Sequence, residues 1–404
     1  MTSPFTRRNW LTACLAATIS SRLSADDATV KVTTDETEIP RPPEAVPVPP
    51  EELSAAIQRG IDFLLLDQRP NGSWGSATLT KDLNIYAPIP GSHDAFKAAV
   101  TAMALQSLID SGGDRADVQQ AIDRGEKWLV EHLPQVRRAN GDAIYNIWTH
   151  CYAIPALIRL IARRPNDAAH REKLKGIIEL QFDLLSRYES VDGGWGYYDF
   201  KYETKQPSSD SISFVNAAVL VAFYEAKQAG FEPPARIVKR ALDAIQRQRL
   251  PDHSYLYGEY LKWRPRRGIN RPGGSLGRSQ ACNVALRLWG DTTVTDQVLT
   301  DWLDRLFTRN GWLDIGRKRP IPHESWFQVA GYFYYFGHYY AAWCIAQLPS
   351  EKRPFYQAHL ARTLLVRQEK DGSWWDYPFY DYHQPYGTSF ALWTLARCSS
   401  KHPI

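Results

Sequence analysis

The chain of 404 residues is long enough to bury one large core. Its formal net charge is only +4 and no long basic run occurs, so the sequence gives no indication of nucleic-acid binding. It contains 14 Trp, 21 Tyr and 15 Phe, an aromatic content that suits a wide apolar interior or the wall of a cavity.

The first 25 residues are typical of a twin-arginine export signal. The Arg7-Arg8 pair precedes an apolar run from Trp10 to Ile19, and Ser24-Ala25 is the predicted cleavage point. The apolar run is shorter than the roughly 20 residues that a bilayer requires, so we expect no transmembrane span. These features predict an exported protein, either periplasmic or extracellular. Residues 26–50 are polar and then Pro-rich, which predicts a disordered linker.

The cysteines indicate neither a lipid anchor nor a disulfide framework. Cys14 fits a lipoprotein box, but the box opens the apolar run instead of ending it, so lipid anchoring is not expected. The other four cysteines lie in apolar stretches without paired spacing, and we expect buried free thiols. They are Cys151, Cys282, Cys344 and Cys398.

Residues 51–400 are predicted to be one domain built from a repeat of about 60 residues, a period beyond that of most open solenoids. Three turn-like breaks have nearly the same letters, at residues 71–75, 192–196 and 371–375. Their Gly and Trp residues are interpreted as structural, because Gly permits positive φ and Trp packs between helices. Fainter breaks lie at residues 140–142, 251–253 and 310–312.

The segments between the breaks predict two kinds of helix. Those leading into a break are amphipathic, with apolar residues at three- and four-residue spacing. They cover residues 52–68, 115–133, 168–188, 234–249, 295–307 and 352–368. Those following a break are apolar nearly all round. They cover residues 95–109, 147–162, 212–226, 279–288, 326–348 and 386–398. Six such pairs predict an all-α (α/α)6 toroid of six helical hairpins, with the apolar helices inside.

A closed ring has a consequence for the position of a functional site. All inner helices follow the same kind of break, so they should run parallel and bring their N-termini to one mouth. Helix N-termini carry unpaired N–H groups and a partial positive charge. We therefore expect site residues at the starts of the inner helices, where an anion or polar group is favoured.

The breaks and the helices after them resemble the prenyltransferase and squalene-cyclase repeat superfamily. Residues 68–75 and 368–374 are similar to its QW repeats, and residues 192–199 with 207–213 resemble hopene cyclases. Tyr382-His383 ahead of residues 386–392 resembles the final repeat of protein prenyltransferase β subunits. The resemblance covers residues 53–398. It implies the toroid fold and a small hydrophobic, isoprenoid-like ligand, with or without a diphosphate.

The sequence lacks part of the motifs that class II cyclases and prenyltransferases use for catalysis. Class II cyclases protonate their substrate with a DxDD motif, which this sequence lacks. Prenyltransferases hold zinc with Asp, Cys and His; His383 matches the His, but Cys282 lacks the Asp two residues before it. We therefore predict no cofactor; zinc is the alternative that the resemblance leaves open, but the signature residues do not support it. The sequence leaves open whether the protein is an enzyme, which by resemblance would be an isomerase or transferase.

Four residues of the inner segments are candidates for catalysis. Asp210 opens the third segment and is either a helix N-cap or a carboxylic acid facing the cavity. His150 begins the second inner helix, His338 lies within the fifth, and His383 precedes the sixth. Three histidines on the inner ring suggest a proton-transfer or metal cluster that converges with Asp210. The alternative is that each is a hydrogen-bonded core residue.

Aromatic and basic residues are candidates for ligand binding. The aromatic candidates are Trp148, Tyr335, Tyr339 and Trp375. Such a lining suits an isoprenoid chain or a carbocation over ring faces, unless the rings are plain core. Arg278 and Arg319 belong to basic segments near the starts of the fourth and fifth inner helices. We expect them to bind an anion at the mouth, or else to form a solvated loop face.

Two other functions compete with a cyclase- or prenyltransferase-like one. Toroids of this type also host glycoside hydrolases and lyases, which need two carboxylates roughly 5–10 Å apart. The candidate carboxylates at the mouth are Asp199, Asp210 and Glu324. The third function is a non-catalytic binding scaffold. A deep aromatic pocket would favour the first function, an open acidic groove the second, and a filled centre the third. The oligomeric state is not predicted.

Overall fold

A computed structural model describes residues 39–81, 90–199, 207, 211–321, 323 and 328–399. The predicted signal peptide, residues 1–25, lies outside these residues, as do most of the predicted linker, Asp210 and Glu324. None of the helices in the described parts combines the length and apolar character that a bilayer crossing requires.

Within the described residues the fold is all-helical, with thirteen α-helices. The inner helices are α2 (Pro90–Ser111), α4 (Asn146–Arg163), α6 (Ser213–Gln228), α8 (Pro272–Leu288), α11 (Phe333–Ala346) and α13 (His383–Ala396). The outer helices are α1 (Pro50–Asp67), α3 (Ala116–His132), α5 (Ala168–Arg187), α7 (Ala235–Gln248), α9 (Asp296–Thr308) and α12 (Arg353–Leu365). The short α10 (Asn310–Asp314) lies between α9 and α11. Twelve of the 16 residues of α6 are buried, against six of the 14 residues of α7.

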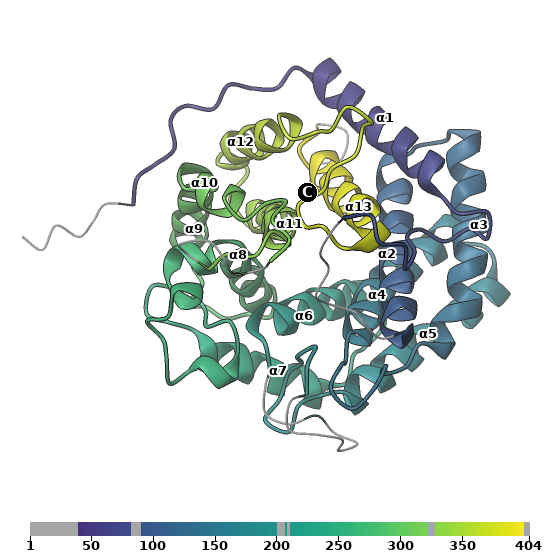
Figure 1. Cartoon of the computed structure of the whole chain (residues 1–404), viewed down its shortest axis with the longest axis horizontal. Helices are drawn as coiled ribbons and strands as arrows, with labels where there is room; N and C mark the ends of the chain where they lie inside the picture. Colours follow the sequence, from purple (N-terminus) through teal and green to yellow (C-terminus); the bar gives the residue numbers. More distant parts are fainter. Residues whose placement is uncertain are drawn as a thin grey trace, which may run out of the picture. The chain divides into compact units, whose positions relative to one another are not determined.

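The inner helices form a closed ring (Figure 1). Each inner helix packs on the next one along the chain, and α13 packs on α2, so the sixth meets the first. The outer helix α1 also packs on α13, which ties the first hairpin to the last. Because an outer helix separates successive inner helices along the chain, all six inner helices run in the same direction. The predicted (α/α)6 toroid is confirmed.

The residues just before α1 contact the outer ring. Residues 39–49 form no helix. The Thr308 hydroxyl of α9 donates to the Pro40 carbonyl at 2.8 Å. The guanidinium of Arg41 lies 5.4 Å from the ring centre of Phe355 in α12. This part of the predicted linker therefore lies against α9 and α12.

The three Gly-Trp breaks place their tryptophans in the same structural position. Trp74, Trp195 and Trp374 are fully buried. Each indole N–H donates to the carbonyl ten residues earlier, in the last turn of the preceding outer helix. The acceptors are Leu64 (2.7 Å), Leu185 (2.8 Å) and Leu364 (2.9 Å). The last carbonyls of a helix have no partner within the helix, so each indole satisfies a group that would otherwise be buried without one.

The first glycine of each of these breaks allows a close approach between neighbouring hairpins. The φ angles are +93° at Gly72, +97° at Gly193 and +88° at Gly372. A Cβ would lie 2.4, 2.6 and 2.4 Å from the carbonyl oxygens of Arg124, Arg240 and Arg59, respectively. These arginines belong to α3, α7 and α1, which are the next outer helices around the ring. A side chain is therefore excluded both by the backbone conformation and by space.

Predicted helix boundaries differ from the structure most at the starts of α8 and α11, and one predicted break is helical. α8 begins at Pro272 instead of residue 279, because Pro fits the first helical position and the glycines after it permit close packing on α11. A Cβ on Gly337 of α11 would lie 2.8 Å from the Cα of Gly277 in α8. α11 begins at Phe333 instead of residue 326, and Gln328 before it has a positive φ of 55°, which a helix does not permit. The fifth break, at residues 310–312, is the helix α10 instead of a turn.

Candidate functional site

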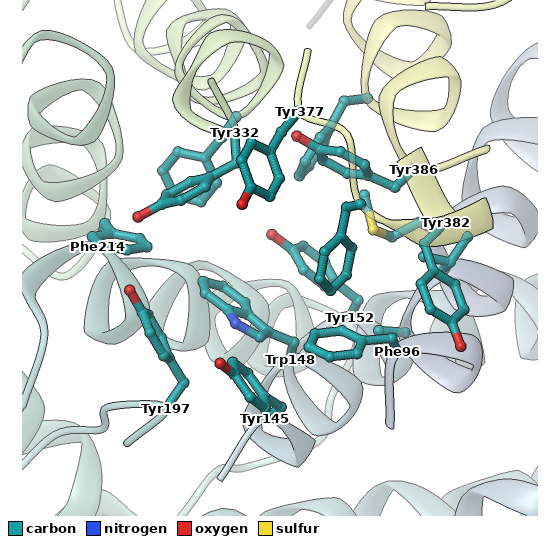
Figure 2. A pocket seen from close by; sticks show the side chains of 16 residues that line it. Phe96, Tyr145, Trp148, Tyr152, Tyr197, Phe214, Tyr332, Tyr377, Tyr382 and Tyr386 are labelled. Carbon is teal, nitrogen blue, oxygen red and sulfur yellow. The ribbon is translucent and has the colours of Figure 1, made fainter. Parts of the chain in front are cut away.

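The inner helices surround a cavity of about 160 Å³ in the N-terminal half of the ring (Figure 2). Of the described residues that line it, thirteen are aromatic, three are aliphatic and none is charged. The aromatic residues are Phe96, Tyr145, Trp148, Tyr152, Tyr197, Phe214, Tyr332, Phe336, Tyr377, Phe379, Tyr382, Tyr386 and Phe390. The aliphatic residues are Ala99, Val100 and Met103. We call this space the aromatic cavity.

Six of the seven tyrosine hydroxyls among the described lining residues of the aromatic cavity are hydrogen-bonded to other protein groups. Tyr145 bonds to Tyr198, Tyr197 and Tyr332 to Tyr257, Tyr377 to the Pro320 carbonyl, Tyr382 to the His93 carbonyl, and Tyr386 to Asp376. A buried hydroxyl with a partner has little need of water or of a polar ligand. The wall therefore offers mainly carbon to whatever enters the cavity.

One buried carboxyl group reaches this wall through a tyrosine. Asp376 is fully buried. Its Oδ1 accepts the hydroxyl of Tyr386, and its Oδ2 accepts the backbone N–H of Tyr335 at 3.0 Å. Burial raises the pKa of Asp376 to about 7. At neutral pH this carboxyl therefore populates both protonation states, one hydrogen bond away from a hydroxyl of the cavity wall.

Charged residues join three inner helices toward their C-terminal ends. Arg159 lies two turns beyond Tyr152 on α4. Its Nε lies 3.0 Å from both carboxylate oxygens of Asp110 on α2, and its Nη1 lies 2.8 Å from Glu225 on α6. This ion group links three inner helices on the side of the ring opposite their N-termini.

A second hollow of about 250 Å³ lies beside the aromatic cavity, and Tyr197 lines both. We call it the outer hollow. Its other described lining residues are Tyr198, Ile212, Tyr257, Tyr260, Leu261, Arg267, Ile269, His323 and Gln328. The Tyr257 hydroxyl bonds to that of Tyr332 at 3.0 Å, and Tyr332 lies 3.3 Å from Nε2 of His323. Burial, reinforced by nearby arginines, lowers the pKa of His323 to about 4, so the imidazole is neutral at pH 7. The outer hollow is the more polar of the two spaces.

The three predicted histidines do not meet. Nδ1 of His150 lies 2.7 Å from Oε1 of Gln181 on α5. Nε2 of His338 lies 2.8 Å from the Asn310 side chain on α10, while His383 contacts the Tyr380 carbonyl at 2.6 Å. Burial lowers the pKa of all three to about 4. The expected convergence is therefore wrong, because each imidazole is held by a different neighbouring element and none lines the aromatic cavity. Among the described residues, no three His, Cys, Asp or Glu side chains are grouped so that they could hold a metal.

The predicted aromatic residues have separate locations. Trp148 lines the aromatic cavity. Tyr339 packs instead against Trp393, with ring centres 4.3 Å apart, and Tyr335 is a buried residue outside the described cavity lining. Trp375 contacts His383 edge-on at 5.1 Å, and the ammonium of Lys318 lies 4.4 Å from its ring centre. Trp148 therefore belongs to the lining of the aromatic cavity, and Tyr339 lines a small pocket that shares Tyr152 and Phe390 with it. The ligand-binding role of the four residues stays a prediction.

The predicted anion-binding arginines also differ from each other. Arg278 is fully buried, and its guanidinium donates to the carbonyls of Tyr255 (3.0 Å), Gly274 (2.8 Å) and Ile269. Arg278 therefore joins backbone segments through its hydrogen bonds. The expectation that it binds an anion at the mouth is not met. Arg319 is exposed, and its Nε donates to the Ile315 carbonyl at 2.8 Å.

The carboxylates that a sugar-cleaving site would need are only partly described. Asp199 is buried and pairs with Arg138, whose Nη2 lies 2.9 Å away. Asp210 and Glu324 lie outside the described residues, so their predicted roles stay predictions.

The four cysteines that were predicted to be free thiols form no disulfide among the described residues; three of them are buried and Cys398 is half-buried.

The sequence prediction missed Asp376 and Tyr386. A signal for Asp376 was present in the repeat itself. When the three Gly-Trp breaks are aligned on their tryptophans, Asp376 stands where the other two breaks have Ser76 and Tyr197. An acid in place of a small or aromatic residue marks this position as different. Its hydrogen bond to Tyr386 could not be anticipated, because it depends on how the loop crosses α13.

No family model matches the chain. An inactive variant of an α-1,6-mannanase of glycoside hydrolase family 76 from Salegentibacter sp. has a similar structure, with a TM-score of 0.54 and 10% identity. The match covers 86% of this chain and 98% of the mannanase. A D-mannose isomerase gives a TM-score of 0.51 at 12% identity, covering 85% of this chain and 96% of the isomerase. A type II terpene cyclase from Scytonema gives 0.48 at 14% identity, covering 86% of this chain and 97% of the cyclase. At these identities the similarity concerns the toroid fold and not the activity.

Proposed function

We propose that this protein binds a hydrophobic, isoprenoid-like ligand and holds its hydrocarbon part in the aromatic cavity. The observation that carries the proposal is the wall of thirteen aromatic side chains, without a charged group among the described lining residues. An engineered apolar cavity of about 150 Å³ stays dry and binds benzene, so a space of this size and character favours hydrocarbon over water. A sugar would leave its hydroxyls without partners against such a wall.

Asp376 and Tyr386 are our candidates for chemistry on that ligand. A carboxyl group with a pKa of about 7 still holds its proton in a large fraction of molecules at neutral pH. The hydroxyl of Tyr386 lies between this carboxyl and the cavity, so it can pass a proton to a ligand while Asp376 replaces it. Under this proposal the pair supplies the acid that the missing DxDD motif would supply in a class II cyclase.

The binding of farnesol, an uncharged isoprenoid probe, tests the proposal. Ala99 lines the aromatic cavity, so A99F should fill it and weaken binding by about tenfold or more. A235F adds the same side chain at an exposed position of α7 and should bind like the original protein. Calorimetric titration measures both. Equal farnesol affinity in A99F and A235F, or no binding to the original protein, would contradict the proposal.

A carbohydrate-active function has one observation in its favour, at a different place. Burial and the nearby Asp381 raise the pKa of Asp67 to about 7, while Arg69 opposes the shift. Asp381 itself accepts the Ser76 hydroxyl at 2.8 Å and pairs with Arg69. A protonated carboxyl beside a second carboxyl suits acid–base cleavage of a glycosidic bond. Neither residue lines the aromatic cavity or the outer hollow.

The two functions separate in one assay. α-1,6-Linked mannooligosaccharides, the class of compound bound by the similar mannanase, should neither bind nor be cleaved under the hydrophobic-ligand proposal. If the protein cleaved these oligosaccharides, and if D67N and D381N lost this activity while A99F kept it, the carbohydrate function would be established. The active site would then be at Asp67 and Asp381.

A further inference from the structure

A basic loop with an exposed tryptophan precedes α8. We define the Trp263 loop as residues 260–271. The indole of Trp263 is 84% exposed, and the ring of Tyr260 is 45% exposed. Large aromatic side chains are normally buried on folding, and a fully exposed indole beside other apolar surface indicates a contact with a partner.

The same loop carries five cations. They are Lys262, Arg264, Arg266, Arg267 and Arg271, all of which are exposed. Lys262 lies 3.5 Å from Glu259. Within the described parts of the chain, the four arginines form no salt bridge. The loop therefore presents positive charge that the described residues do not neutralise, and a partner with negative charge is electrostatically favoured.

The Trp263 loop also borders the outer hollow, which adjoins the aromatic cavity. Tyr260, Leu261 and Arg267 line the outer hollow, which shares Tyr197 with the cavity. The loop leads into the N-terminus of α8, so it lies at the mouth where the inner helices begin. A partner that contacts this loop therefore lies beside the outer hollow.

We propose that the Trp263 loop docks on the surface of an anionic lipid bilayer. Tryptophan prefers the boundary between lipid headgroups and acyl chains, because its ring is apolar and its N–H is polar. Arginine and lysine beside it are attracted by anionic headgroups. An apolar ligand dissolves in the bilayer and not in water, so docking would place the mouth against the ligand's reservoir. This last step rests on the proposed function, whereas docking itself does not.

A nucleic acid is the other polyanion that a basic, aromatic loop could contact. The bilayer is favoured because the loop borders a hollow that shares Tyr197 with an apolar cavity, and such a cavity suits a hydrocarbon and not a nucleotide. The chain as a whole also has a net charge of only +4, whereas nucleic-acid-binding domains are usually strongly basic.

Sedimentation with lipid vesicles tests the proposal. The protein should bind vesicles that contain phosphatidylglycerol and should bind vesicles of phosphatidylcholine alone much more weakly. The double variant R264E/R266E should lose at least about tenfold in affinity for the anionic vesicles, because two attractive charges become repulsive. W263A should lose about several-fold, because the interfacial anchor is removed while the charge is unchanged. Arg264, Arg266 and Trp263 do not line the outer hollow.

Matched variants control for charge and for exposed apolar surface. K127E/K173E makes the same change in net charge at exposed positions of α3 and α5. L66A removes an exposed apolar side chain from α1. Both should bind anionic vesicles like the original protein.

Three results would overturn docking. The first is an absence of vesicle binding, and the second is equal loss in R264E/R266E and K127E/K173E. The third is a short DNA duplex that competes with anionic vesicles for the protein, together with a W263A variant that binds the vesicles as well as the original protein. That result would identify a general polyanion site. Farnesol binding without vesicles should stay unchanged in all these variants, so a failure of docking is distinguished from a failure of the cavity to bind ligand.

Discussion

Two sets of tryptophans in the described part of this protein have different physical roles. Trp74, Trp195 and Trp374 fill gaps between hairpins, and each indole N–H satisfies a carbonyl at the end of an outer helix. Trp148 starts an inner helix and faces the aromatic cavity. The comparison teaches that a high aromatic content alone does not indicate a ligand site. The environment of each ring decides whether it stabilises the fold or borders a space.

Removal of a break tryptophan should have the largest effect on stability. W195A deletes a fully buried indole and leaves the Leu185 carbonyl without its donor. We expect a loss of about 3–5 kcal/mol in the free energy of unfolding. W148A should cost clearly less, because that ring already borders a hollow, but it should weaken farnesol binding.

Urea denaturation of W195A and W148A, followed by far-UV circular dichroism, measures the difference. If the two substitutions lowered the free energy of unfolding equally, Trp195 and Trp148 would contribute equally to packing, and the prediction would be wrong. A W195A protein that unfolds like the original would show that the break is not a structural unit.

The glycine of the same break should have the next largest effect. In G193A the new methyl group would lie 2.6 Å from the Arg240 carbonyl, and φ is +97°. We expect a loss of about 2–3 kcal/mol, since both backbone strain and a clash with rigid backbone contribute. Gly113 is the matched control, because its φ is +57° and a Cβ there would have no atom within 4 Å among the described residues. G113A should therefore cost only about 1 kcal/mol.

The same denaturation series measures both glycine variants. A similar cost for G193A and G113A would mean that only the backbone conformation matters and that the contact between hairpins contributes nothing.

The last prediction concerns pH, because the stability contributions of Asp376 and His150 should change with pH in opposite directions. The pKa of Asp376 is raised from 3.8 to about 7, so the folded state binds its proton more tightly. Its contribution to stability is present at low pH and is lost as pH rises from about 4 to 7. The pKa of His150 is lowered from 6.5 to about 4, so its contribution is lost as pH falls from 6.5 to 4.

D376N should therefore flatten the decline of stability between pH 4 and 7, while H150Q should flatten the rise over the acidic part of that range. Thermal unfolding of both variants across this range measures the slopes. If D376N and H150Q changed the slope of stability against pH in the same direction, or if D376N left it unchanged, the prediction would be wrong. Asp376 would then not be protonated at neutral pH and would not be a candidate acid.

Most of the fold followed from local patterns. The alternation of amphipathic and apolar segments at a constant interval predicts six hairpins, because only a ring buries six all-round apolar helices without capping repeats. The errors lie where local signals conflict with packing. The Gly-rich start of α8 was interpreted as a loop, but close contact with α11 at Gly277 and Gly337 makes it helical.

The candidate site was much harder to predict. Trp148 was identified because it begins an inner helix, whereas His150, two residues later, points to Gln181 on the outer helix α5. A rotation of about 200° separates two such positions on a helix, and helix phase relative to the ring axis is set by packing. Tyr145, Tyr197 and Tyr377 reach the cavity from connecting segments, where no periodic pattern applies.

The sequence by itself determined the repeat, the closed helical ring and the direction of the inner helices, because these follow from local hydrophobic patterns and turn residues. Only the tertiary structure decided which side chains face the centre, which carboxyl is buried beside a cavity hydroxyl, and which of the described arginines at the mouth form no salt bridge. Those properties depend on contacts between residues far apart in the chain, and burial and charge acquire their effect only when such contacts form.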